Sequence, residues 1–158
     1  MLEPAAVQFQ DFLLTPMYFR SISEKSNFEN TIKASAWRQM RICDLEKCMS
    51  VTHLPGKDIS FNLELTDPID KFLGDKIEWR GVSGNYIVTF GADSGAEKGF
   101  DKNLPTMRAS VGAFTRLWFG VLPASVLAFS DKLSAPPELL NDLDRKLRLP
   151  KPNADWDF

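Results

Sequence analysis

Alternating apolar and polar positions predict most of the strands in this chain. Ile59, Phe61, Leu63 and Leu65 alternate with polar residues, which is the pattern of a strand with one buried face. The same period of two predicts further strands over residues 37–43, 77–80, 86–90 and 107–111. Residues 81–84 read as a hairpin turn, and residues 91–106 read as a polar loop. We therefore expect a sheet of about five strands.

Apolar residues at helical spacing predict helices in the last third of the chain. One helix spans roughly residues 112–122, a second starts at Pro123, and Pro136 and Pro137 open a third in which leucines recur. Asp44 is suited to cap a further short helix. Strands that cluster first and helices that cluster last indicate an α+β domain, with helices covering one face of the sheet.

The first part of the chain has a weaker pattern. Residues 4–14 can form a short helix, and residues 15–36 read as irregular. We expect an N-terminal helix and irregular extension over residues 1–36, followed by one domain over residues 37–158.

Composition excludes several classes of function. The chain has 158 residues, of which 44% are hydrophobic and 25% charged, and its net charge is -2. Binding to nucleic acid or to an anionic membrane needs concentrated Lys and Arg, which are not found here. No apolar run approaches the length of a membrane span, and no signal-peptide pattern opens the chain. We expect a cytoplasmic protein.

Candidate catalytic side chains are few. Cys43 and Cys48 are predicted to be reduced thiols. His53 is the single histidine, and a Cys–His nucleophile in this segment lacks an obvious third group to orient it. One His and two Cys are too few for a metal site, so neither a metal nor another cofactor is expected.

Several segments together resemble a known module. They are Trp37–Leu45, Phe61–Pro68, Leu104–Gly120, Ala124–Ala128 and the aromatic ending Trp156-Asp157-Phe158. Their order and spacing resemble the sterol carrier protein type 2 fold, and in particular the C-terminal domain of Eis-like GNAT N-acetyltransferases. The resemblance covers residues 37–158. It implies a non-catalytic module that binds an apolar ligand or a protein partner. The alternative is an accessory domain that serves the active site of a GNAT domain.

An apolar arc on the helix over residues 112–122 is the candidate ligand site. This arc is wider than packing against a sheet requires, and in lipid-binding relatives the corresponding layer lines a tunnel. The alternative is that the same side chains simply fill the core. The residues expected to line a cavity for an apolar molecule or lipid are Phe61, Leu63, Phe114, Leu117, Trp118 and Val121.

The resemblance also bears on catalysis. An Eis-like enzyme binds acetyl-CoA in a GNAT domain, where a glycine-containing loop opens a helix. Gly81 and Gly84 lie between two predicted strands instead, so we expect no acetyltransferase activity from this chain alone. Joined to a GNAT domain, the terminal carboxylate of Phe158 would act as the general base, as the resemblance implies. The alternative is that the terminal aromatics only pin the tail. A GNAT domain and a second copy of the chain are both candidate partners.

Overall fold

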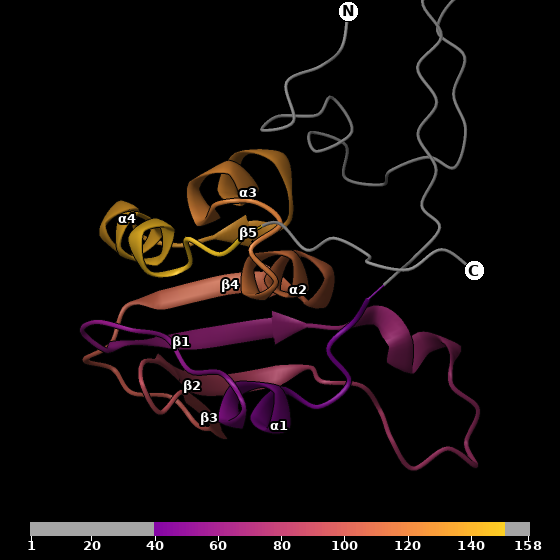
Figure 1. Cartoon of the computed structure of the whole chain (residues 1–158). Helices are drawn as coiled ribbons and strands as arrows, with labels where there is room; N and C mark the ends of the chain where they lie inside the picture. Colours follow the sequence, from indigo (N-terminus) through magenta and orange to yellow (C-terminus); the bar gives the residue numbers. More distant parts are fainter. Residues whose placement is uncertain (1–39, 151–158) are drawn as a thin grey trace, which may run out of the picture. The chain divides into compact units, whose positions relative to one another are not determined.

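A mixed five-stranded sheet forms the centre of the part of the chain that the structure describes. The computed structural model describes residues 40–150, and its elements belong to one compact unit that starts at Arg41. The strands follow the spatial order β3-β2-β1-β4-β5 (Figure 1). The parallel pair is β1 with β4, and the other neighbours are antiparallel. The strands are β1 (Ile59–Thr66), β2 (Gly84–Phe90), β3 (Gly95–Lys98), β4 (Thr106–Ser110) and β5 (Leu133–Ser134).

The helices begin close to where the sequence predicts them. Asp44 caps the first of them, because its carboxylate accepts a hydrogen bond from the backbone N–H of Lys47 at 3.0 Å. Ser110 caps the helix after β4 in the same way, through the N–H of Ala113 at 3.1 Å. The helices are α1 (Leu45–Ser50), the short 3₁₀ helix η2 (Pro68–Phe72), α2 (Val111–Trp118), α3 (Ala124–Ser130) and α4 (Pro137–Lys146). The predicted α+β class is confirmed.

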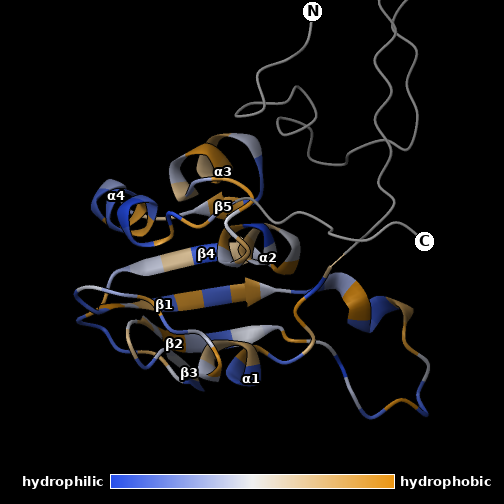
Figure 2. Ribbon diagram, in the orientation of Figure 1, coloured by the Kyte–Doolittle hydropathy of each residue, from blue (hydrophilic) through white to orange (hydrophobic). Residues whose placement is uncertain are grey.

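The two faces of the sheet differ sharply in polarity. Figure 2 shows the alternation along β1, whose apolar side chains all fall on one face. That face packs under the helices, and α1 through α4 all contribute side chains to the same core. The buried strand residues of this core include Phe61, Leu63, Leu65, Tyr86, Val88, Phe90, Met107 and Ala109. On the opposite face, β1 and β4 carry hydroxyl, amide and charged side chains, and β2 adds the apolar Ile87.

Two predicted strands are wrong. Residues 40–43 form no strand: Ile42 is 1% exposed, but its N–H bonds to the hydroxyl of Thr115 at 3.3 Å, and Met40 is 56% exposed. Residues 77–80 form no strand either, because they belong to the segment of residues 68–83 between β1 and β2, called the excursion below, and no hairpin forms there. Alternation predicted these strands, but a ladder also requires a neighbouring strand to pair with.

Two observed strands were missed because they are short. β3 lies inside the predicted polar loop, and β5 has only two residues. Each adds an edge to the sheet. The predictions for residues 1–36, for residues 37–39 and for the terminal Phe158 fall outside the described residues.

Candidate functional site

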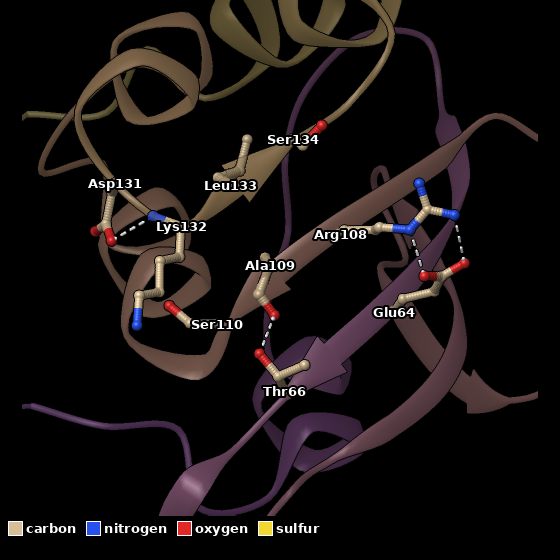
Figure 3. A pocket seen from close by; sticks show the side chains of 9 residues that line it. All are labelled: Glu64, Thr66, Arg108, Ala109, Ser110, Asp131, Lys132, Leu133 and Ser134. Atoms are coloured by element: carbon tan, nitrogen blue, oxygen red, sulfur yellow. Dashed lines mark hydrogen bonds and ion pairs between the residues drawn. The ribbon is translucent and has the colours of Figure 1, made fainter.

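A shallow groove lies where the parallel strands end. The register pairs Thr66 with Ser110, so the carboxyl ends of β1 and β4 lie together, and α2 starts immediately beyond. In sheets with parallel strands this edge is the usual place for a ligand. The groove has a volume of about 360 Å³. Figure 3 shows the residues that line it: Glu64, Thr66, Arg108, Ala109, Ser110, Asp131, Lys132, Leu133 and Ser134.

A bidentate ion pair between Arg108 and Glu64 forms one side of the groove. Arg108 donates from Nε to Oε2 of Glu64 at 2.6 Å and from Nη2 to Oε1 at 3.3 Å. This geometry fixes both side chains across the β1–β4 pair (Figure 3). The side chain of Arg108 is 70% exposed, so the pair contributes little to stability.

The opposite side of the groove is built around Asp131. Arg116 donates to its Oδ2 at 3.0 Å, and the backbone N–H of Lys132 donates to its Oδ1 at 2.6 Å. The side chain of Asp131 is only 10% exposed. Both carboxylates of the groove, Glu64 and Asp131, are therefore already engaged by cations.

A larger groove of about 780 Å³ runs between α4 and residues 54–60. One wall is closed by Lys146, whose ammonium donates to the carbonyl oxygens of four consecutive residues. The distances to Leu54, Pro55, Gly56 and Lys57 are 3.4, 2.8, 3.2 and 3.1 Å. An ammonium has three donors, so these four contacts are shared. Lys146 thereby ties the loop before β1 to α4.

Asp67 is the most buried ionisable group near the end of β1. Its side chain is fully buried, and it accepts hydrogen bonds from the N–H groups of Val82 and Ile69, each at 3.0 Å. Arg41 adds an ion pair to the same carboxylate. The Ser83 hydroxyl bonds to the Asp67 N–H at 2.8 Å. One carboxylate thus joins the two ends of the excursion to the segment that precedes α1.

The ionisation of Asp67 follows from these contacts. Burial raises the pKa of the carboxyl group, but the N–H donors of Val82 and Ile69 and the guanidinium of Arg41 outweigh that effect and lower the pKa below its usual value. The Asp67 carboxylate is therefore ionised at neutral pH and is not suited to accept a proton there.

The residues predicted to bind an apolar ligand lie in or beside the core between the sheet and the helices that cover it. Phe61, Leu63, Phe114 and Leu117 are at most 1% exposed. Phe90 joins them, with its ring centroid 5.8 Å from that of Phe61 and 6.4 Å from that of Phe114.

Two further predicted residues, Trp118 and Val121, are half-buried at the edge of this core. The indole N–H of Trp118 donates to the hydroxyl of Thr52 at 2.9 Å. The two grooves described above are lined by other residues, so a ligand cavity at the six predicted positions stays a prediction. Alternation along β1 places Glu64 on the face opposite the core, but only the topology brings Arg108 of β4 beside it.

The cysteine and histidine side chains give no support to a nucleophilic site. Burial is the main cause that raises the pKa of the Cys48 thiol, with Asp44 adding to it, so the reactive thiolate is disfavoured. The ring of His53 is oriented by the carbonyl oxygen of Ala92, 2.7 Å from Nδ1. Within residues 40–150, no three His, Cys, Asp or Glu side chains gather to hold a metal ion. In the same range no helix is long and apolar enough to cross a membrane.

Comparisons with known proteins find a similar fold in solved structures. No family model matches the chain, and no curated protein matches it. Among solved structures, a GCN5-related N-acetyltransferase from Kribbella flavida matches with a TM-score of 0.56 and 16% identity over 71% of this chain. One from Anabaena variabilis matches with a TM-score of 0.55 and 18% identity over 71%. A conserved protein of Enterococcus faecalis V583, named "Probable N-Acyltransferase", matches with a TM-score of 0.53 and 20% identity over 70%.

The extent of these matches is as informative as their names. This chain covers 26%, 26% and 25% of the Kribbella, Anabaena and Enterococcus proteins, respectively, so it spans about a quarter of their length. At this identity the likeness establishes a shared fold. The same arrangement of sheet and helices therefore occurs as one part of larger proteins, of which two are named N-acetyltransferases and one a probable N-acyltransferase.

Proposed function

We propose that this chain is an accessory domain of a GNAT-type N-acetyltransferase and acts beside a catalytic domain. The observation that carries the proposal is the match of most of this chain to one quarter of three proteins that bear acyltransferase or acetyltransferase names. The resemblance to the C-terminal domain of Eis-like enzymes, read from the sequence, points the same way. The remaining three quarters of such a protein would supply the acetyl-CoA site.

The described residues support a role other than independent catalysis. Gly81 and Gly84 lead into strand β2 and do not open a helix, so they do not form the phosphate-binding loop that acetyl-CoA requires. The carboxylates of Glu64, Asp67 and Asp131 are each engaged by an arginine. A general base needs a free lone pair that reaches its substrate. The domain would therefore position groups for a partner's active site.

The terminal carboxylate of Phe158 is the group we propose for that role. In an Eis-like arrangement it would enter the catalytic domain and accept a proton from the amine substrate. A partly desolvated carboxylate has a raised pKa, which suits it to this task. Pro150 and Pro152 would restrict the chain before it, which would lower the entropy cost of placing the carboxylate.

The first test measures binding and assembly. Titration calorimetry of the purified chain with acetyl-CoA should show no saturable binding. The chain is then co-expressed with GNAT domains from its own source genome, and release of CoA is followed with a panel of primary amines. We expect one domain to form a stable complex whose rate exceeds that of the domain alone. A micromolar dissociation constant for acetyl-CoA on the isolated chain, or the failure of every domain to assemble, would refute the accessory role.

The second test addresses Phe158 within that complex. Adding one glycine after Phe158 moves the carboxylate by about 3.5 Å and should reduce the turnover rate at least a hundredfold. Phe158→Leu is the matched control, because it keeps the carboxylate in place and removes only the ring. Unchanged turnover in the extended chain would assign the tail a purely structural role and leave the assembly itself intact.

A further inference from the structure

The groove between α4 and residues 54–60 is large enough to hold a peptide segment. Its volume of about 780 Å³ lies within the range that is usual for ligand sites. The apolar side chains that line it are Leu54, Ile59, Leu139 and Leu149, and three prolines add rigid surface. Leu149, where the described chain nears its end, is 38% exposed. Such a lining favours an occupant that carries a large apolar side chain.

The charged residues of this groove are separated along α4. Glu138 and Asp142 lie in its earlier turns, whereas Arg145 lies in its last turn and Arg148 follows the helix. Within residues 40–150, no salt bridge engages Arg148, and Arg145 meets Asp142 at 3.9 Å with its side chain 74% exposed. The groove therefore has a basic end, which lies at the C-terminus of α4.

The loop before β1 brings another base to the same end. Lys146, in the last turn of α4, donates to the carbonyl oxygen of Lys57 at 3.1 Å, so residue 57 lies beside that turn. No salt bridge of the described residues engages Lys57. The neighbouring acid does not neutralise it, because the carboxylate of Asp58 lies against Gly91. An anionic occupant would find its partners at this end of the groove.

The chain itself continues from this basic end. Leu149 lines the groove, and residues 151–158, called the tail below, read Lys-Pro-Asn-Ala-Asp-Trp-Asp-Phe. The tail places two carboxylates, Asp155 and Asp157, on either side of Trp156. The step from Leu149 to Asp155 can span about 20 Å when extended, whereas α4 is about 15 Å long. The acidic and aromatic residues of the tail can therefore reach every part of the groove.

We propose that this groove is a docking site for the chain's own tail, with Trp156 against the apolar lining and Asp155 and Asp157 facing the bases at the end of α4. The charges of the two parts are complementary, and a Trp is a frequent anchor in an apolar pocket. This inference does not depend on the proposed acetyltransferase role. In a chain that also serves a GNAT domain, the tail would have to leave the groove before Phe158 could act.

Attachment to the same chain makes a weak contact sufficient. A short flexible linker gives an effective concentration on the order of 1 mM. A contact with a dissociation constant of about 0.1 mM between separate molecules would then be about 90% formed. We expect docking to be independent of protein concentration and to weaken with added salt, because the charge pairs are exposed.

Fluorine NMR of the full chain, labelled with 5-fluorotryptophan, is the experiment. The chain has four Trp residues, and the signal that disappears in Trp156→Phe belongs to Trp156. A docked ring is removed from water, so its signal should shift little when D₂O replaces H₂O. Arg145→Glu combined with Arg148→Glu should lower the docking constant about tenfold, which exposes the ring in about half of the molecules. Lys71→Glu combined with Lys76→Glu is the matched control.

The control changes the net charge by the same amount at two exposed lysines that do not line the groove. It should leave the Trp156 signal as it is in the native chain. Circular dichroism checks that all variants are folded.

A charge swap tests the pairing itself. Adding Asp155→Arg and Asp157→Arg to the double reversal at Arg145 and Arg148 should restore the docked signal. A native Trp156 signal with the isotope shift of an exposed ring overturns the proposal, as does a docked signal that the double reversal leaves unchanged or a swap without recovery. Docking that grows with protein concentration would assign the tail to a second copy and overturns the intramolecular site. Assembly with a GNAT domain is measured separately, so its failure would leave this result intact.

Discussion

Replacement of Asp67 by alanine tests whether one buried carboxylate organises the end of β1. In the native protein this side chain is fully buried and accepts hydrogen bonds from Ile69 and Val82 in addition to the ion pair with Arg41. Asp67→Ala leaves two N–H groups without their acceptor and removes the partner of a cation. Each of these losses is unfavourable, because a polar group out of water needs a partner.

The expected cost can be bounded. Breaking a buried ion pair by removing one partner costs about 3–5 kcal/mol. The Arg41 side chain is 32% exposed, so water compensates part of its loss, and we expect about 3 kcal/mol. For a domain of this size, that corresponds to a fall in melting temperature of roughly 6–12 °C. Asp142→Asn is the control, because Asp142 is 55% exposed and lies 3.9 Å from Arg145.

The same site predicts a pH dependence with a definite sign. The pKa of Asp67 is lowered in the folded protein, so its contribution to stability is complete above the unfolded pKa, near 3.8. That contribution is lost as the pH falls below about 4 towards the folded pKa.

Urea unfolding of the native chain and of Asp67→Ala across pH 2.5–7 is the assay. The difference between their free energies of unfolding should be constant above about pH 5 and should shrink below pH 4. A difference below about 1 kcal/mol at pH 7, or one that grows as the pH falls, would refute the role assigned to this carboxylate.

Three further substitutions probe other parts of the fold. Lys146→Met should lower the free energy of unfolding, measured in urea titrations, by roughly 1–2 kcal/mol. Four loop carbonyl groups lose their shared donor, but most of them can form hydrogen bonds with water instead, which limits the cost. Leu117→Ala should cost about 2–5 kcal/mol in a filled core, whereas a small cost together with binding of a fluorescent fatty acid would favour the cavity. Gly81→Ala brings Cβ into a clash with Oδ2 of Asp67 and should lower the melting temperature more than Gly56→Ala does, because Gly56 has the same φ of 86° but open space around it. Equal effects would contradict the clash.

Local sequence determined the elements whose signals lie within a few residues. Alternation identified β1 because its apolar residues fall on one face, and the cap at Asp44 marked a helix start through a hydrogen bond to an N–H three residues on. The α+β class followed from the order of these elements. Burial of Phe61 and Phe114 followed from their apolar character, because removing such rings from water dominates folding.

Tertiary structure decided what depends on partners distant in the chain. Ile42 is buried without forming a strand, because Thr115, distant in sequence, satisfies its N–H. Glu64 and Arg108 meet only because β1 and β4 are parallel neighbours, and the groove lies beside this pair. Trp79 looked like part of a strand, yet it lies on an excursion held by Asp67. A hydrophobic pattern records which side chains avoid water. It does not record which backbone groups pair, and that pairing fixed the sheet edges, the grooves and the exposed excursion.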